Sequence, residues 1–314
     1  MNKRVLFADK PHPVLEERLT KAGFVCEYYK GKSSEELKSV ITGYGGIIVR
    51  SRTKLTADIL DVAKQLQFIG RLGSGMENID TEYAALKNIA CYSSPEGNSN
   101  AVGEHALGML LALINHIHTA DTEVRNGIWH REANRGMELR GKTIGIIGFG
   151  NTGPAFARCL SGFGMNILVY DKFKSGFGID YILECGMEQI FEEADILSFH
   201  IPLTKETHYL LNDRYLKRFK KRIFVLNTSR GEVVNTASLA THLRSGKVLG
   251  AALDVIEYEN LLAESFSYEK TDENFRYLAS LPNVIFTPHI AGVTEESHFK
   301  LADVLADKII NAFI

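Results

Sequence analysis

The stretch GKTIGIIGFGNTGPAFARCL, residues 141–160, decides the fold of this chain. Its apolar run up to Ile147 is typical of a buried strand, and the residues from Thr152 onward have the apolar spacing of a helix. Between them lies a glycine-rich turn, residues 148–153, with the order G-x-G-x-x-G. A strand, such a turn and a helix in this order predict a nucleotide-binding βαβ unit.

The turn itself predicts contacts with a dinucleotide. Gly148 permits a tight turn, Gly150 leaves room for a pyrophosphate, and Gly153 lets the helix pack closely on the strand. The helix N-terminus offers free N–H groups and the positive end of the helix dipole to phosphates. The cofactor-binding residues predicted in this turn are Gly148, Gly150, Asn151, Thr152 and Gly153.

The next apolar run ends in Tyr170 and Asp171, which we also predict to bind the cofactor. Asp171 lies 23 positions after Gly148, close to the usual spacing of roughly 20. A carboxylate at this place accepts hydrogen bonds from the ribose hydroxyls and repels a 2′-phosphate. The pattern therefore predicts NAD rather than NADP, although the adjacent Lys172 works against this preference.

The whole chain is expected to form two α/β domains. Its 314 residues are about twice the length of a typical domain. Strand-like and helix-like segments alternate over the first hundred residues and again after Lys142, which predicts two doubly wound units with parallel sheets. Residues 99–127, between the two series, are predicted to form one long and largely apolar helix.

Composition excludes several classes of partner. The net charge of -2 and the absence of Lys/Arg-rich blocks argue against nucleic acid and anionic membranes. The N-terminus lacks the apolar run of a signal peptide, so we expect a soluble cytoplasmic protein. No metal site or disulfide framework is expected, because the cysteines are far apart in the sequence. They are Cys26, Cys91, Cys159 and Cys185.

Polar side chains follow three apolar runs in the second half. IFVLNTSRGEVVN (223–235) contains Arg230, and VIFTPHIAG (284–292) contains His289. AALDVIEYEN (251–260) offers three carboxylates, Asp254, Glu257 and Glu259. Because ligands bind beyond the carboxyl ends of strands in open α/β sheets, we expect these groups to meet at one edge.

This set of side chains fits the oxidation of a 2-hydroxy acid, which moves a hydride from C2 and a proton from its oxygen. A histidine can shuttle the proton near neutral pH, and a neighbouring carboxylate favours its imidazolium form. An arginine can hold the substrate carboxylate and polarise the carbonyl. A lone histidine after a proline is more often structural, but Arg230 and the nucleotide turn favour catalysis for His289.

Several segments of the chain match motifs of one enzyme family, in the same order. They are RLGSGMENID, GNSNAVGEHALGMLLAL, GKTIGIIGFGNTG, VYD, SFHIPLTKETHYLLN, LNTSRGEVVN, GAALDVIEYEN and TPHIAG. Through them the chain resembles, over essentially its whole length, the D-isomer-specific 2-hydroxyacid dehydrogenase family. The resemblance implies an NAD-binding Rossmann domain over residues 99–287. It also implies a discontinuous substrate-binding domain, residues 1–98 and 288–314, an active site in the cleft between the domains, and a homodimer with the long helix at its interface.

The resemblance also implies roles for single residues. His289 corresponds to the general acid/base, Glu259 to its carboxylate partner and Arg230 to the substrate-binding arginine, with Glu257 as the alternative carboxylate. Asp254 is similar to the aspartate that contacts the nicotinamide carboxamide. The other positions carried over are His200, Pro202, Thr207, Thr228 and Ser229 for the cofactor, and Ser74 and Gly75 for the substrate carboxylate.

The substrate is predicted from two shorter resemblances. IIVRSRTKLTADIL (47–60) and RGMELRGKTIGIIG (135–148) resemble phosphoglycerate dehydrogenases, in which the residues matching Arg50 and Ser51 approach the substrate. We therefore predict 3-phosphoglycerate, as in serine biosynthesis, with Arg50, Arg52 and Lys54 as cations for its phosphate. These cations could instead be solvated charges on a loop. The alternatives are a glyoxylate, hydroxypyruvate or D-lactate-type reductase and, in another class, an NAD-sensing corepressor-like protein.

Two departures from the family concern the C-terminal third. Asn260 replaces a frequent proline, and residues 261–281 are longer than in many relatives, so an extra helix or flap is expected there. The sequence shows no match to a C-terminal regulatory extension, so feedback inhibition by serine through such a domain is not expected.

Overall fold

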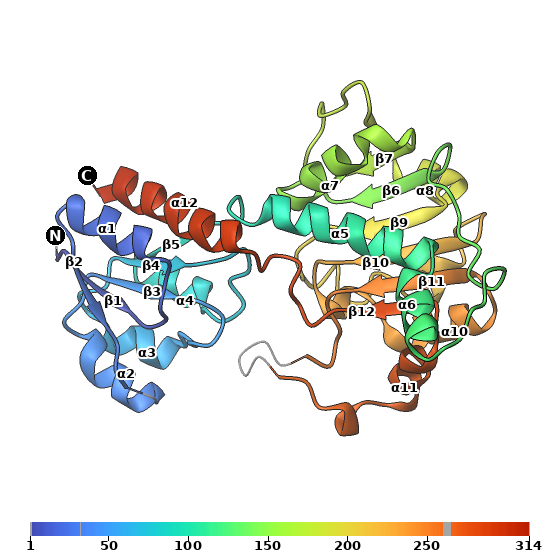
Figure 1. Cartoon of the computed structure of the whole chain (residues 1–314). Coiled ribbons are helices and arrows are strands. Elements are labelled where there is room, and N and C mark those ends of the chain that lie inside the picture. Colours follow the sequence, from blue (N-terminus) through green and yellow to red (C-terminus); the bar gives the residue numbers. More distant parts are fainter. Residues whose placement is uncertain (1, 32, 260–264, 314) are drawn as a thin grey trace. The chain divides into compact units, whose positions relative to one another are not determined.

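A computed structural model describes residues 2–31, 33–259 and 265–313. The chain divides into two compact units (Figure 1). The first comprises Met1–Ser99, Ser265 and Val293–Ile314, and the second Asn100–Glu259 and Phe266–Gly292. Each unit has one parallel sheet with helices interleaved between its strands, so the predicted α/β fold with two Rossmann-like units is confirmed.

The first unit is built on a five-stranded parallel sheet with the order β2-β1-β3-β4-β5. Its strands are β1 (Arg4–Phe7), β2 (Val25–Tyr28), β3 (Gly46–Val49), β4 (Phe68–Arg71) and β5 (Ala90–Ser93). The helices between them are α1 (Pro13–Lys21), α2 (Ser34–Ile41), α3 (Ala57–Val62) and α4 (Thr81–Leu86). The chain leaves β1 for β2 on one side and then crosses to β3 on the other, so the topological switch point lies between β1 and β3.

The last helix, α12 (Glu295–Phe313), completes the core of this first unit. It packs beside α1, as Figure 1 shows with α12 in red and α1 in blue. Leu305 and Ile309 are fully buried in one cluster with Phe7 and Phe68 of the sheet. Helices cover both faces of this sheet, which explains why its central strands are apolar at consecutive positions.

The second unit has a seven-stranded parallel sheet with the order β12-β11-β10-β9-β6-β7-β8. Its strands are β6 (Thr143–Ile147), β7 (Asn166–Tyr170), β8 (Leu183–Glu184), β9 (Ile196–Phe199), β10 (Ile223–Asn227), β11 (Val248–Leu253) and β12 (Val284–Phe286). The main helices between them are α7 (Thr152–Leu160), α8 (Met187–Glu193), α9 (Asp213–Leu216), α10 (Thr236–Arg244) and α11 (Glu273–Ser280). The strand order reverses between β6 and β9, so this unit has its switch point there.

The prediction of one helix over residues 99–127 is wrong. The structure has two helices, α5 (Ser99–Ile114) and α6 (Ile117–Arg125). His116 between them has a φ of 53°, in the left-handed region that a right-handed helix cannot contain. The side chain of Asn115 turns back to donate to the carbonyl of Leu111 at 3.2 Å, which competes with continuation of the helix.

The longer segment 261–281 is described from residue 265 onward, and Asn260 lies outside the described residues. The described part contains a 3-10 helix, Tyr268–Lys270, and α11. Among the described residues, no helix has the length and apolarity needed to cross a membrane. The same residues contain no group of three or more His, Cys, Asp or Glu placed to hold a metal ion, and the four cysteines are unpaired.

We predict that Leu305→Ala lowers the free energy of unfolding of the first unit by about 2–5 kcal/mol, because it leaves a cavity in a packed core. Urea denaturation measures this loss. Amide hydrogen exchange in the core strands of the second unit should stay unchanged. Lys300→Ala, at an exposed position of the same helix, is the control and should change stability by less than about 0.5 kcal/mol. Equal losses in both variants would contradict this account of α12.

Candidate active site

The glycine-rich turn lies at the switch point of the second unit, between β6 and α7. Gly148 has a φ of +97°, and a Cβ there would lie 2.4 Å from the carbonyl oxygen of His200. A Cβ on Gly153 would lie 2.2 Å from the carbonyl oxygen of Gly148, whereas one on Gly150 would meet open space. Glycine is thus required for packing at two positions, and the third leaves the backbone open to a ligand.

This turn fits the phosphates of a dinucleotide. The backbone N–H groups of Gly150 and Asn151 donate to none of the described residues. They stand just before and at the start of α7, where Thr152 begins the helix and the helix dipole favours an anion. Open backbone donors at a helix N-terminus are the groups that a pyrophosphate requires.

Asp171 follows β7 directly and fastens the glycine-rich turn from the side. Its carboxylate accepts hydrogen bonds from the backbone N–H groups of Phe149 at 2.7 Å, Phe173 at 2.8 Å and Lys174 at 3.0 Å. Burial disfavours the charged form, but these three donors outweigh it and hold the pKa of Asp171 below its usual value. Asp171 is therefore ionised at neutral pH, and Lys172 beside it pairs with Glu206.

His200 supports the glycine-rich turn from inside the protein and is not open to solvent at this edge. Its ring is buried and bonded on both sides, to Ser198 at 2.9 Å and to Thr152 at 3.1 Å. Burial lowers the pKa of His200 to about 3, so the ring is neutral. Its side chain therefore acts on the glycine-rich turn through Thr152. Pro202 and Thr207 are joined by a 2.7 Å hydrogen bond from the Thr207 hydroxyl to the Pro202 carbonyl, which shapes the loop after β9.

Arg230, Asp254 and His289 follow β10, β11 and β12, which are neighbouring strands. The sheet therefore brings all three to its carboxyl edge, as the sequence predicts. In the same order the edge continues through His200 after β9 to the glycine-rich turn after β6.

His289 and Glu259 form a hydrogen-bonded pair. The ring Nδ1 of His289 lies 2.9 Å from Oε2 of Glu259, and the side chains are 35% and 16% exposed. Glu257, the alternative carboxylate, turns elsewhere. It accepts from the hydroxyl of Tyr209 and, at 3.0 Å, from the backbone N–H of Thr236. The pairing leaves Nε2 of His289 available for proton exchange with a substrate.

Asp254 is 1% exposed and holds the loop that carries His289. Its carboxylate accepts from the hydroxyl of Thr287 at 2.6 Å and from the backbone N–H groups of Ile290 and Ala291, both at 2.9 Å. Its carbonyl accepts from the backbone N–H of His289, whose φ is +55°. The sequence analysis missed His105, whose Nε2 lies 3.1 Å from the Thr287 hydroxyl and 3.6 Å from Asp254.

The turn that carries Arg230 is fixed by Asn227, which the sequence analysis also missed. The buried amide of Asn227 donates to the Arg230 carbonyl at 2.8 Å and accepts from the backbone and hydroxyl of Ser229. The hydroxyl of Thr228 is buried and has no hydrogen-bond partner among the described residues. An unpaired buried hydroxyl at this edge fits the polar part of a bound cofactor.

Two predicted substrate-binding loops lie in the first unit. The loop after β3 carries Arg50 and Ser51. Asp9 accepts from the backbone N–H of Arg50 at 2.6 Å, and the buried amide of Asn78 donates to the Arg50 carbonyl at 2.8 Å and the Thr53 carbonyl at 2.6 Å. These two side chains fix the loop backbone. The Asn78 position in RLGSGMENID gives no local signal for this role, because its partners are about 25 residues away in sequence.

Ser74 and Gly75 follow β4, at the same carboxyl edge of the first sheet. Their backbone N–H groups donate to none of the described residues, and the Ser74 hydroxyl bonds to Asn98 at 3.0 Å. Adjacent open N–H donors in a turn are suited to an anion such as a carboxylate.

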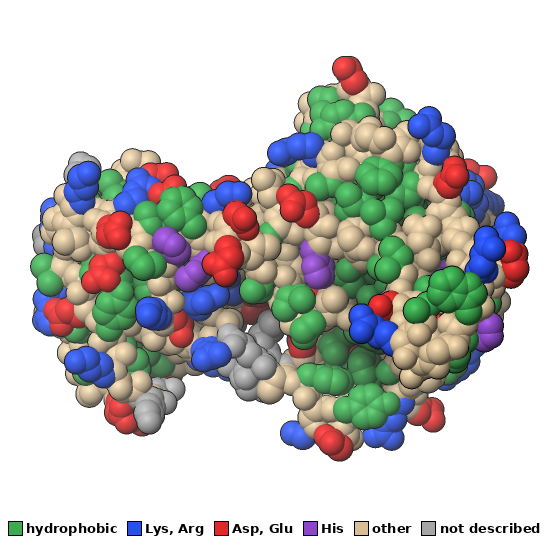
Figure 2. All heavy atoms as spheres, in the orientation of Figure 1, with side chains coloured by type: hydrophobic (Ala, Val, Ile, Leu, Met, Phe, Trp, Pro, Cys, Tyr) green, Lys and Arg blue, Asp and Glu red, His purple; other side chains and the backbone are tan. Residues whose placement is uncertain are grey.

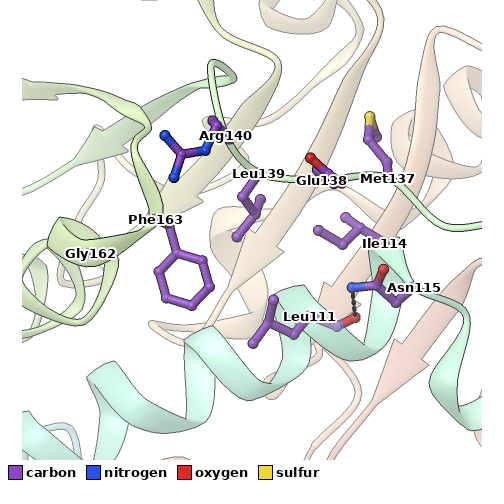
Figure 3. Close-up of a pocket in the computed structure, with 9 residues that line it drawn as sticks. All are labelled: Leu111, Ile114, Asn115, Met137, Glu138, Leu139, Arg140, Gly162 and Phe163. Atoms are coloured by element: carbon purple, nitrogen blue, oxygen red, sulfur yellow. Dashed lines mark hydrogen bonds between the residues drawn. The ribbon is translucent and has the colours of Figure 1, made fainter.

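A separate cavity of about 330 Å³ lies in the second unit, next to the segment that precedes β6 and not at the carboxyl edge of that unit's sheet (Figure 3). It is formed by the end of α5, the segment before β6 and the 3-10 turn after α7. Its walls are mainly apolar, with Leu111, Ile114, Leu139 and Phe163 pointing toward one another. The cavity contains none of the predicted site residues.

Comparison with known proteins is consistent with this geometry. The family model described as D-isomer specific 2-hydroxyacid dehydrogenase, NAD binding domain, matches residues 107–291. Hydroxypyruvate reductase of Thermotoga maritima is 37% identical over 277 residues, covering 88% of this chain and 87% of that protein. D-3-phosphoglycerate dehydrogenase of Archaeoglobus fulgidus is 35% identical over 316 residues, covering 98% of this chain.

The chain spans only 57% of the length of the Archaeoglobus enzyme. Among solved structures, D-lactate dehydrogenase of Aquifex aeolicus, complexed with NAD and lactic acid, is similar with a TM-score of 0.81 and 29% identity. That alignment covers 98% of this chain and 95% of the other.

We predict that Asp171→Ser lowers the ratio of kcat/KM with NAD to that with NADP by about tenfold, the factor for a change near 1.4 kcal/mol. The variant removes a negative charge that would repel a 2′-phosphate. Because Asp171 also fastens the glycine-rich turn, both cofactors should bind more weakly. Steady-state kinetics with each cofactor separates the change in preference from the general loss of binding. An unchanged ratio would mean that Asp171 only holds the turn in place and does not select between NAD and NADP.

Proposed function

Since the chain belongs to the D-isomer-specific 2-hydroxyacid dehydrogenase family, it is an NAD-dependent oxidoreductase acting on CH–OH groups, and we propose that its substrate is 3-phosphoglycerate. In this proposal the protein interconverts 3-phosphoglycerate and 3-phosphohydroxypyruvate, which is the reaction expected for a role in serine biosynthesis. We also propose that the first unit is the substrate-binding domain and the second the NAD-binding domain.

The proposed mechanism assigns one task to each residue. Nε2 of His289 removes the proton from the C2 hydroxyl during oxidation and returns it during reduction, while Glu259 holds Nδ1 and stabilises the imidazolium. Arg230 binds the substrate carboxylate and polarises the C2 oxygen. The backbone N–H groups of Ser74 and Gly75 bind the same carboxylate.

When bound, nicotinamide supplies the hydride acceptor or donor for C2. We propose that the glycine-rich turn binds the pyrophosphate, Asp171 and Tyr170 bind the adenosine ribose, and Thr228, Ser229 and Asp254 line the nicotinamide side. Because three donors already occupy the Asp254 carboxylate, its predicted contact with the carboxamide must use a remaining lone pair.

The observation that carries the substrate proposal is the state of Arg50. Its side chain is exposed, and its guanidinium has no hydrogen-bond or ion-pair partner among the described residues, although Asp9 and Asn78 fix its backbone. An arginine held in place without a carboxylate partner is suited to an anionic group of a ligand.

Hydroxypyruvate is a second candidate substrate. The favouring observation is the 37% identity to the Thermotoga hydroxypyruvate reductase, which this chain covers over 87% of its length. Hydroxypyruvate differs from 3-phosphohydroxypyruvate, the keto acid of the first candidate pair, by a phosphoryl group, so Arg50 is the residue on which the choice depends.

We further propose a homodimer that uses α5 and α6. The α6 helix has no buried residue, and Ile117 and Val124 on it are each more than half exposed. Trp129, shortly after α6, is 76% exposed. Exposed apolar side chains of this size are typical of protein interfaces. Sedimentation equilibrium at micromolar concentration tests this, and a monomer would contradict it.

The substrate proposal predicts that the wild-type protein reduces NAD with 3-phosphoglycerate at a kcat/KM at least about tenfold higher than with D-glycerate or D-lactate, because only the phosphorylated acid can pair with Arg50. The measurement is NADH absorbance with a panel of D-2-hydroxy acids, and reduction of hydroxypyruvate is assayed in parallel. Activity with glycerate, lactate or hydroxypyruvate but none with the phosphorylated acids would reject the proposal.

The mechanism predicts that His289→Ala lowers turnover by roughly 10²–10⁴-fold, because the proton then has no shuttle. NADH binding, measured by fluorescence, should change little. Glu259→Gln should also lower turnover, whereas Glu257→Gln, the matched control, replaces the charged acceptor for Tyr209 and Thr236 by a neutral amide and should act mainly on stability. Near-normal turnover of His289→Ala would remove that residue from its role, and equal turnover losses in the two glutamine variants would remove Glu259.

A further inference from the structure

The switch point of the first unit places two side chains that the proposal above does not use, Asp9 and His12, in the loop next to the loop that carries Arg50. Its sheet has the doubly wound order 2-1-3-4-5, in which ligands bind beyond the carboxyl ends of the first and third strands. Asp9 and His12 follow β1, and Arg50 follows β3. The 2.6 Å bond from the backbone N–H of Arg50 to Asp9 joins the two loops directly.

A second histidine, His298, reaches this place from the first turn of α12. Its ring meets the ring of His12 edge to face, with the centroids 5.3 Å apart. Nε2 of His298 is buried and has no hydrogen-bond partner among the described residues. A buried ring nitrogen without a protein partner is costly, and a ligand, an ion or an ordered water can satisfy it.

The orientation of His12 is also defined. Its Nδ1 accepts from the backbone N–H of Val14 at 3.2 Å and so caps the N-terminus of α1. A nitrogen that accepts a hydrogen bond carries no proton, so the proton of neutral His12 is on Nε2. His12 is therefore a hydrogen-bond donor through that atom.

The charges around His298 are mostly positive. Burial lowers its pKa, Arg50 and His12 lower it further by repulsion, and Glu295 on the same helix opposes them. Asp9, the other acid close by, already accepts from the Arg50 backbone and the Thr53 hydroxyl. Figure 2 shows histidine side chains on the first unit with both basic and acidic side chains nearby. An anion at this place would relieve the repulsion.

We propose that His298, His12 and Arg50 form the binding place for the phosphoryl group of the substrate, which makes the two histidines specificity-determining residues. This inference rests on the proposed function, which it deepens. A phosphate monoester brings a charge near −2 and three acceptor oxygens, and the three side chains supply cationic or N–H donors to match. The unphosphorylated part of the substrate gains nothing from them.

Kinetics with two substrates tests this role. His298→Gln should raise KM for 3-phosphoglycerate by about tenfold or more, the loss expected for a hydrogen bond to a charged group. Its kcat and its KM for D-glycerate should stay nearly constant. His12→Asn, which keeps a good helix cap but removes the imidazole, should act in the same direction. Lys300→Gln is the matched control, because it removes a charge from the same helix two residues away and should leave both KM values unchanged.

Binding of inorganic phosphate gives a readout that does not depend on turnover. In wild-type protein, phosphate should raise the pKa of His298, measured from its ring resonances by NMR, and the rise should be smaller in His12→Asn and Arg50→Gln. An unchanged His298 titration at saturating phosphate overturns the phosphoryl site. Equal KM changes for both substrates, or no change in either histidine variant, overturn it as well.

The two proposals can fail separately. If the wild-type enzyme turns over glycerate but not 3-phosphoglycerate, the substrate proposal fails together with the specificity role of the histidines, and the phosphate titration then decides only whether the three side chains bind phosphate. If His298→Gln does not fold, as shown by its melting curve, His12→Asn supplies the kinetic test and wild-type NMR the binding test.

Discussion

The buried carboxylate of Asp254 is the constraint on which the catalytic arrangement depends. A charge that is 1% exposed is tolerated only when its oxygens are satisfied, and here Thr287, Ile290 and Ala291 supply the donors. All three donors belong to the loop after β12, so their hydrogen bonds to the carboxylate determine the path of that loop. The same path puts His289 in a left-handed conformation that a non-glycine residue seldom adopts, and in this conformation its ring meets Glu259.

The parallel sheet performs the rest of the assembly. Residues 200, 230, 254 and 289 are far apart in sequence, but each follows a strand, and the four strands are neighbours. Parallel strands end at one edge, so no long-range side-chain contact is needed to gather these groups. What the edge does not provide is orientation. That comes from Asn227 at the Arg230 turn, from Asp254 at the His289 loop and from His200 behind the glycine-rich turn.

This division explains which features the sequence could predict. The glycine-rich turn, Asp171 and the polar groups after strands follow from local spacing. The choice between Glu257 and Glu259 could not be derived from spacing, because both follow the same strand; family resemblance favoured Glu259, and the structure pairs it with His289. The break at Asn115 and His116 was missed because apolar periodicity continues across it. Asn78, Asp9 and His105 were missed because their roles depend on partners distant in sequence.

The way the proposed site residues are divided between the two units suggests why members of one family can act on different substrates. Arg230, Glu259 and His289 all belong to the second unit, whereas Arg50, His12 and His298 all belong to the first. In the proposed mechanism the second unit supplies proton transfer and the arginine for the carboxylate, which every 2-hydroxy acid needs, so this unit can stay the same when the substrate changes. The part of the acid beyond C2 differs, and only residues that contact it need to change. The two loops at the β1/β3 switch point and the first turn of α12 can vary without disturbing Asp254, because its carboxylate is held by Thr287, Ile290 and Ala291 of the loop after β12.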